Sequence, residues 1–259
     1  MRAITILFFF ITYSVFSQDT DSVFSHDAES FDILDGWTLK AGIGLTNYRS
    51  AFKGSNYASS HEFAIVKKIH SHIYISSNLN IMNVKATRDL SNSVNSYTPY
   101  PEIYPYEGNG DYFNAKMTEI SLVVSGNIPK VILSLGETFI FPEKVNISLN
   151  IGAGLCNFYS MKYNSISNSY IYAYGYNDVE GAFKERKSFW DLPKARVLIY
   201  GISVDYKLNK DSRISLSYFI HNTDTPYIDA DKGSAKGDNI RNISLGYISS
   251  FDFLEKVKD

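Results

Sequence analysis

The chain has 259 residues and a formal net charge of −2, with 25 Lys and Arg against 27 Asp and Glu. This balance argues against nucleic acid as a partner, because neutralising phosphates requires clustered cations. The single cysteine, Cys156, excludes an intramolecular disulfide and any metal site built from several cysteines.

The first 17 residues have the features of a cleavable export signal. Arg2 supplies a positive start, residues 3–15 are apolar, and Ser17 is a small residue suited to cleavage before Gln18. The apolar run is short for the roughly 20 residues of a spanning helix, so an uncleaved anchor is the less favoured alternative. Residues 18–36, rich in Asp and Ser, are expected to form a periplasmic leader.

From residue 37 onward, short segments alternate apolar and polar residues. Ile147, Leu149 and Ile151, for example, interleave with Ser148 and Asn150. A period of two is typical of a β-strand with one apolar and one polar face. The pattern predicts eight strands, at 37–48, 61–68, 71–85, 115–126, 145–158, 197–207, 211–222 and 239–251.

The connections between these segments are sorted by length. Tight turns are expected at 67–70 and 208–210, and a longer connection with two prolines at 127–144. The other four connections are expected at 49–60, 86–114, 159–196 and 223–238. In an up-and-down barrel these four would all lie at one rim. Together with the export signal, this predicts an all-β fold, an eight-stranded antiparallel up-and-down transmembrane β-barrel with long extracellular loops.

Three segments carry a resemblance to a known family. They are the opening strand Gly36–Gly44, the hairpin from Val204–Leu208 into Arg213–Tyr218, and the closing strand Asn242–Tyr247; the export signal ending before Gln18 matches as well. On these segments the chain resembles the outer-membrane β-barrel domain proteins of Bacteroidota, a porin-like family of small eight-stranded barrels. The resemblance covers about residues 36–251 and implies an outer-membrane location, but no single activity. We expect a monomer, with the barrel at 37–253.

The end of the chain departs from that family. Many such barrels finish on a terminal aromatic residue. Here Phe251 and Phe253 are followed by a short tail, 254–259.

The alternation assigns one face of each strand to lipid and the other to the lumen. Outer-membrane lipid is therefore the expected partner of the outer face. The predicted polar network of the lumen comprises Lys40, Glu62, Asn78, Asn80, Glu119, Asn150, Asp205 and Arg213. A three-residue connection at 208–210 would set Asp205 directly opposite Arg213. Because buried charges must be paired, the interior is expected to be hydrogen-bonded and closed to conduction.

Two of the long connections are rich in tyrosine, which offers an amphipathic contact surface at low entropic cost. These loops are expected to bind a surface glycan or a protein, and the alternative is that the rings only stack on one another. The candidate binding residues are Tyr97, Tyr100, Tyr104, Tyr106, Tyr112, Tyr170, Tyr172, Tyr174 and Tyr176.

No cofactor or metal is expected, since His70 and His72 have no third ligand nearby. The expected function is that of a non-enzymatic barrel, structural or presenting its loops for binding. Three alternatives remain open: a lipid-modifying enzyme, a small passive pore, and a secreted soluble barrel that binds an apolar ligand. The enzyme would use Ser217 and His221 with Glu119 or Glu62.

Overall fold

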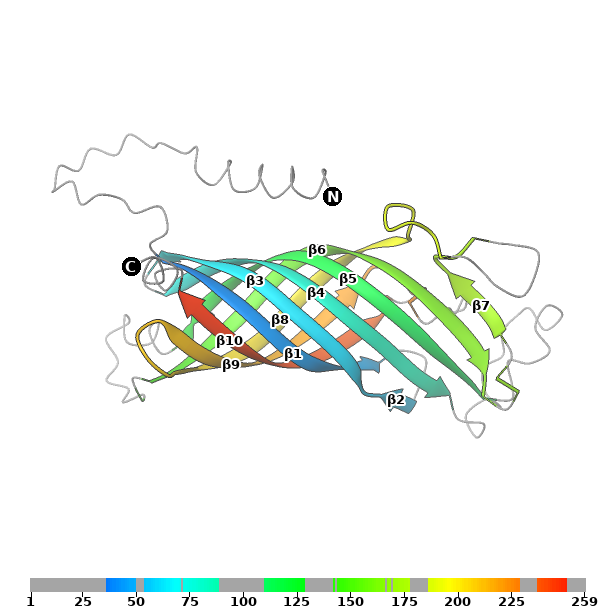
Figure 1. Ribbon diagram of the computed structural model, residues 1–259, viewed down its shortest axis with the longest axis horizontal. Helices are drawn as coiled ribbons and strands as arrows, with labels where there is room; N and C mark the ends of the chain where they lie inside the picture. Colours follow the sequence, from blue (N-terminus) through cyan, green and yellow to red (C-terminus); the bar gives the residue numbers. More distant parts are fainter. Residues whose placement is uncertain are drawn as a thin grey trace, which may run out of the picture. The chain divides into compact units, whose positions relative to one another are not determined.

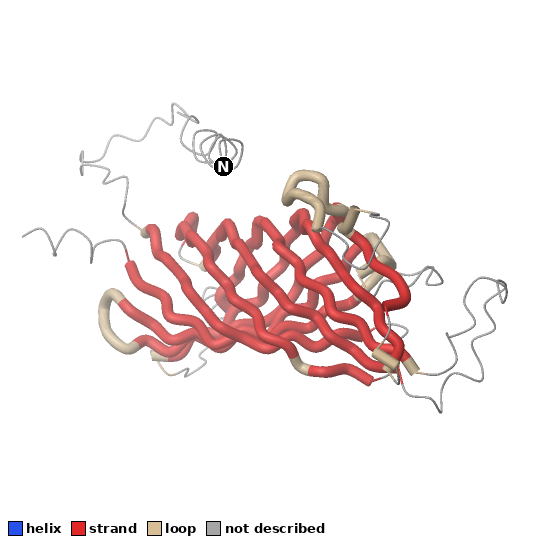
Figure 2. Tube along the Cα trace, turned by 45° about the vertical axis from the view of Figure 1, so that its right-hand side comes forward, coloured by secondary structure: helices blue, strands red, loops and turns tan. Residues whose placement is uncertain are grey.

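Eight long strands close on themselves as an antiparallel β-barrel, which confirms the predicted fold class (Figure 1). The strands are β1 (Trp37–Arg49), β3 (Ala58–His70), β4 (Ile73–Arg88), β5 (Asp111–Asn127), β6 (Val145–Asn164), β8 (Lys194–Lys207), β9 (Ser212–Thr223) and β10 (Asn239–Ser250). Each of them pairs with the next, and β10 pairs with β1 to close the wall. The strands cross the wall at a slant (Figure 2).

The computed structural model describes residues 36–49, 54–70, 72–88, 110–128, 142, 144–165, 167–168, 170–177, 186–228 and 237–250. The expected signal, residues 18–35 of the expected leader and the tail after residue 250 lie outside these ranges. Within them, no helix has the length and hydropathy that crossing a bilayer would require.

The barrel has two unlike rims. The connections after β1, β4, β6 and β9 lie at one end, here called the loop rim, and those after β3, β5 and β8 lie at the other, the turn rim. Two short strands extend the wall at the loop rim: β2 (Gly54–Asn56) pairs with β4, and β7 (Tyr170–Tyr174) pairs with β6 (Figure 1).

The strands also extend further toward the loop rim than the sequence predicts. β5 begins at Asp111 rather than at 115, and β6 continues to Asn164 rather than to 158. The connections predicted at 49–60 and 159–196 therefore contain the short strands β2 and β7. These strands form hydrogen bonds with backbone N–H and C=O groups at the loop-rim ends of the longer strands β4 and β6.

One predicted register is wrong. Asp205 pairs with Ser215, and Arg213 pairs with Lys207, so Asp205 and Arg213 are diagonal rather than directly opposite. The reason is that five residues, 208–212, separate the paired Lys207 and Arg213, where the prediction places only three, 208–210, between paired residues. The backbone N–H of Leu208 closes this turn by donating to the carbonyl of Ser212 at 3.0 Å.

The polarity of the side chains reverses partway along every wall strand. On β4, Ile75 and Leu79 point outward and are exposed, whereas Asn80 is buried inside. Further toward the loop rim, Lys85 is exposed on the outside and Val84 is buried inside. Each strand thus has an apolar outer face in its turn-side half and a polar outward residue just beyond it, and on most strands the inward residues change from polar to apolar near the same level.

The reversal is found on all eight strands. The last outward apolar residues before the change are Leu45, Phe63, Ile81, Ile120, Leu155, Leu198, Ile220 and Ile243. The next outward residues toward the loop rim are Asn47, His61, Asn83, Thr118, Asn157, Arg196, Asn222 and Arg241, all polar. Below this boundary the outward apolar residues form a continuous belt around the barrel. On β6 the belt runs from Ile147 to Leu155, close to the roughly 9–11 residues of a membrane-spanning strand.

The interior of the loop-side half is a packed apolar core. Its fully buried large apolar side chains are Tyr48, Met82, Val84, Phe113, Met117, Phe158, Ile199, Ile228 and Ile240. Tyr48 and Phe113 meet edge to face, with ring centroids 4.9 Å apart. Ile228 belongs to the β9–β10 connection and is completely buried in the same core, so this loop contributes to closing the lumen.

The barrel interior as a candidate functional site

The first polar cluster of the interior is centred on a buried ion pair. Lys40 of β1 and Glu62 of β3 lie 2.8 Å apart, and both side chains are more than nine-tenths buried. Lys40 also donates to the hydroxyl of Ser217 at 3.0 Å, and Ser244 donates to Glu62 at 2.9 Å. Four neighbouring strands, β9, β10, β1 and β3, therefore meet in this cluster, and each of the two charges has a partner as burial requires.

The second cluster crosses the lumen. Nδ1 of His221 on β9 lies 2.7 Å from Oε2 of Glu119 on β5, and both residues are fully buried. Asn80 and Ser121 donate to the other carboxylate oxygen of Glu119 at 2.8 and 3.0 Å. Strands β6 and β8 lie between β5 and β9 in the wall, so this contact spans the interior.

The remaining residues of the predicted network also lie inside the barrel but join neither cluster. Asn150 donates to Ser203 at 3.2 Å and to the carbonyl of Ser148 at 3.3 Å. Asn78 is 6% exposed and its side-chain carbonyl oxygen has no partner among the described residues. Asp205 and Arg213 are half-buried and form no hydrogen bond or ion pair with any residue that the structure describes. The described contacts of the predicted lumen residues thus fall into separate groups.

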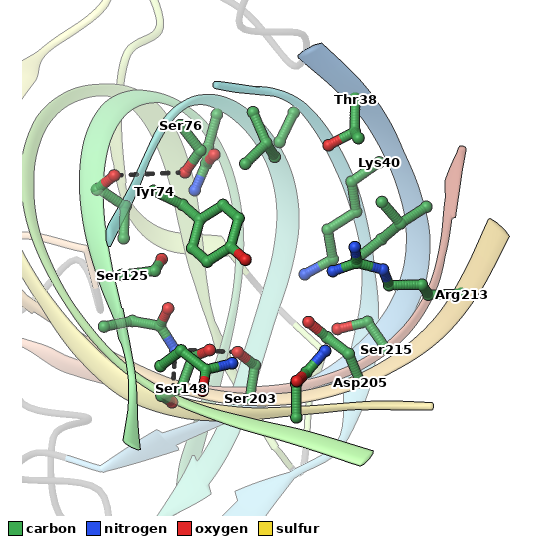
Figure 3. A pocket seen from close by; sticks show the side chains of 18 of the residues that line it. Thr38, Lys40, Tyr74, Ser76, Ser125, Ser148, Ser203, Asp205, Arg213 and Ser215 are labelled. Atoms are coloured by element: carbon green, nitrogen blue, oxygen red, sulfur yellow. Dashed lines mark hydrogen bonds between the residues drawn. The ribbon is translucent and has the colours of Figure 1, made fainter. Parts of the chain in front are cut away.

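A cavity of about 210 Å³ fills the turn-side interior. Tyr74 projects into it, and Asp205, Arg213 and Lys40 border it on the side where β8, β9 and β1 lie (Figure 3). At its inner end Lys40 lies 5.8 Å from the centre of the Phe219 ring. Because Phe219 is buried and the Glu119 cluster lies beyond it, the cavity is a blind vestibule reached from the turn rim.

The residues of the enzyme alternative are not assembled for catalysis. His221 and Glu119 are in contact, but Ser217 bonds to Lys40 and Ser215. Ser217 and His221 are four positions apart on one strand, about 13 Å at the usual rise, which is far beyond hydrogen-bond reach.

The predicted turn histidines are neighbours without forming a metal site. The rings of His70 and His72 meet edge to face at 5.2 Å. Across the described ranges, no group of three or more His, Cys, Asp or Glu side chains is arranged to hold a metal ion.

The tyrosines of the long connections fall into groups with different surroundings. Tyr97, Tyr100, Tyr104 and Tyr106 lie outside the described residues. Tyr112 stacks on Tyr163 at 5.1 Å. Tyr172 and Tyr174 of β7 pair with the inward residues Lys162 and Ser160, and Tyr174 packs against the apolar core and stacks on Tyr227 at 4.9 Å. These contacts give several of the predicted binding residues a packing role.

Tyr170 and Tyr176 are more available at the surface. Tyr170 is 40% exposed. Tyr176 meets Tyr159 edge to face at 5.8 Å, and partial burial, followed by its tyrosine neighbours, raises the pKa of Tyr176 to about 12. Its hydroxyl therefore remains protonated, and able to donate a hydrogen bond, at any physiological pH.

Sequence reasoning missed the loop-side interior. It contains the apolar core and also a buried ion pair, in which Lys162 of β6 lies 2.8 Å from Asp111 of β5. The signal is nevertheless present in the sequence. Along β4 the apolar residues occupy odd positions up to Ile81 and even positions from Met82 onward, and this change of phase marks the boundary.

The pairing and the outer face of the wall define the class: a closed eight-stranded antiparallel barrel with an apolar outer belt. No protein-family model matches the chain, and no curated protein matches it.

Among solved structures, the chain is similar to Neisserial surface protein A, with 12% identity over 83% of this chain and 97% of that one, at a TM-score of 0.46. It is also similar to a major outer membrane protein of Thermus thermophilus, with 11% identity over 82% and 98%, at 0.41. A third is Ail, the attachment invasion locus protein of Yersinia pestis, in complex with the heparin analogue sucrose octasulfate, with 10% identity over 82% and 97%, at 0.38. At these low scores, the description of the fold rests on the strand pairing of this chain.

Proposed function

We propose that this protein is a non-enzymatic integral outer-membrane protein. Its barrel is closed to conduction and holds a rigid, tyrosine-rich surface above the membrane for binding. The observation that carries the proposal is the reversal of side-chain polarity on all eight strands. A barrel dissolved in water has no reason to expose a belt of Leu, Ile and Val on one half only, whereas a bilayer requires such a belt.

The orientation follows from the rims. In outer-membrane barrels the short turns face the periplasm and the long loops face the exterior. The loop-side half would then stand outside the bilayer, where its outward Asn, Lys and Arg side chains meet water. Its apolar core would stabilise it as a core stabilises a soluble domain.

A passive pore fits the interior poorly. An eight-stranded barrel is just wide enough for side chains to fill. In this chain the Glu119–His221 contact and the apolar core fill it at two successive levels.

The binding role is supported by the aromatic residues at the loop rim. Tyr57 is 67% exposed, Trp190 is 49% exposed and Tyr227 is 40% exposed. Aromatic side chains of this kind supply contact area at low entropic cost and suit a glycan or a protein partner. Tyr227 stacks on Tyr174, and Tyr112 stacks on Tyr163; such stacking restricts the motion of the rings and would lower the entropy lost on binding.

Fractionation and conductance test the membrane part of the proposal. The protein should remain in outer membranes after carbonate extraction, migrate in a heat-modifiable way on gels, and begin at Gln18 when sequenced. In planar bilayers it should give no steady nanosiemens conductance. Recovery in the soluble fraction would refute the membrane location, and stable channels would refute the sealed lumen.

The binding role is tested with the double variant Tyr170→Ser/Trp190→Ser. It should lose the binding of intact protein to cells or to a glycan array while keeping heat-modifiable migration. The matched control is Tyr206→Ser, an exposed tyrosine at the turn rim, which should bind as the unaltered protein does. Full binding by the double variant would contradict the proposal. A deletion of 165–190 is a poor test, since it removes β7 and the packing of Tyr174 on the core.

A further inference from the structure

We propose that the turn-side cavity is a binding site for a small zwitterion of amino-acid or dipeptide size. The inference concerns the opposite end of the barrel from the binding surface proposed above and does not depend on it. The cavity of about 210 Å³ is equivalent to roughly seven water molecules at the liquid share of about 30 Å³ each. It is thus large enough for a ligand of that size.

Two opposite charges face this cavity without partners among the described residues. Asp205 on β8 and Arg213 on β9 both line it at diagonal positions on neighbouring strands, and neither forms a hydrogen bond or an ion pair with a described residue. Of the three other charged residues in the lining, Lys40 and Glu62 are paired with each other at 2.8 Å, and Lys68 is exposed at the turn rim. A half-buried charge without a partner is costly, so Asp205 and Arg213 favour a ligand that brings one charge of each sign.

The opposite wall adds an unused acceptor. Asn78 on β4 is 6% exposed, lines the cavity, and leaves its side-chain carbonyl oxygen without a hydrogen bond to any described residue. Strands β5 and β6 separate β4 from β8 in the wall, so Asn78 lies across the lumen from Asp205. Buried polar groups in proteins are nearly always bonded, and one that is left unbonded and borders a cavity indicates a missing donor.

The chemistry of these groups selects the ligand class. The guanidinium of Arg213 offers a planar fork that matches a carboxylate. Asp205 and the carbonyl of Asn78 accept hydrogen bonds, as an ammonium or amide N–H would provide. A phosphate would pair with Arg213 but meet the like charge of Asp205, and a neutral sugar would leave both charges unpaired.

The hydroxyls around the cavity complete the site. Ser76, Ser125, Ser148, Ser203 and Ser215 line it together with Tyr74, whose ring projects into the space (Figure 3). Because the Glu119–His221 contact seals the lumen beyond Phe219, a ligand must enter and leave by the turn rim. The cavity therefore binds and releases its ligand at the turn rim and does not conduct it through the barrel.

Calorimetry on the full chain folded in detergent micelles tests the site. The probe is dialanine, and two matched probes each lack one charge: N-acetyl-dialanine has no ammonium, and dialanine amide has no carboxylate. The unaltered protein should bind dialanine at millimolar concentration and each matched probe about tenfold more weakly, the loss expected for one charge-assisted hydrogen bond.

Variants of Arg213 and Asp205 test which charge of the ligand each residue binds. Arg213→Gln should bind dialanine and dialanine amide equally, and Asp205→Asn should bind dialanine and N-acetyl-dialanine equally. Arg241→Gln and Asp224→Asn remove the same charges from the loop-side half and should bind as the unaltered protein does. Heat-modifiable migration verifies that each variant is folded. No binding of dialanine, equal binding of all three probes, or loss of binding in the control variants would overturn the proposal.

Discussion

The two halves of the barrel use one continuous backbone in opposite ways. In the turn-side half the exposed outward residues are mainly Leu, Ile and Val with some Tyr and Phe, and the interior is lined by Ser, Asn and charged residues. In the loop-side half the outward residues are polar and the interior contains Tyr48, Met82 and Phe113 at 0% exposure. The hydrogen-bonded ladders run through the boundary without interruption. The backbone pairing therefore does not depend on which face of the wall carries the apolar side chains.

In the proposed outer-membrane location, this difference reflects what each surrounding medium demands of the same wall. Where lipid covers the outside, the bilayer already removes the outward apolar side chains from water. The interior then needs no apolar core and can be polar, provided its charges are paired. Where water covers the outside, the wall has to bury apolar surface of its own, and the lumen is the place available for it. A single chain thus places a soluble-type barrel on top of a membrane-type barrel.

The largest expected effect comes from the loop-side core. Phe113→Ala removes a fully buried ring and should lower the free energy of unfolding by about 3–5 kcal/mol. Denaturant titration in lipid vesicles measures it. The neighbouring outward residue provides the control, because Asn114→Ala should change the same quantity by less than about 0.5 kcal/mol. Equal effects at the two positions would mean that the loop-side interior is not a core.

A smaller effect is expected at the middle of the outer belt. Ile151 is 62% exposed at the centre of the β6 belt, and Ile151→Arg should cost about 2–4 kcal/mol in vesicles. Asn114→Arg, above the boundary, should be close to neutral because water solvates the new charge. If Ile151→Arg were equally harmless, the belt would not be in contact with lipid.

The smallest effect is expected at an exposed ion pair of the loop-side half. Arg196 and Asp224 lie 4.0 Å apart with 86% and 53% of their side chains exposed. Arg196→Gln should change the free energy of unfolding by no more than about 0.5 kcal/mol, since solvent screens such pairs. A loss above about 1 kcal/mol, the upper end for exposed pairs, would show that this surface is shielded from water, contrary to its place outside the belt.

The strand number and the faces of the turn-side half follow from the sequence, because period-two alternation and loop length are local properties. The reversal does not follow from alternation alone. A strand with one apolar face over its whole length is the simplest interpretation of the pattern, and that interpretation misses Met82 and Phe113 as interior residues. Allowing the phase of the alternation to change within a strand finds them.

The candidate site is predictable in part for the same reason. All eight residues proposed for the lumen lie inside the barrel, since the side on which a residue lies depends only on parity. Which of them meet depends on register and on the tilt of the strands. Two additional residues between the paired positions place Arg213 opposite Lys207, and the contact of Glu119 with His221 joins residues 102 positions apart in the chain. Neither is a local property.

Cys156, the sole cysteine of the chain, is completely buried on the inner face of β6, directly opposite Glu119 in the ladder. A thiol reagent can reach it only before the wall closes or after it opens. Cys156 is therefore a native kinetic probe of assembly. The rate at which its thiol loses reactivity toward a maleimide reports barrel closure, and no residue has to be replaced to measure it.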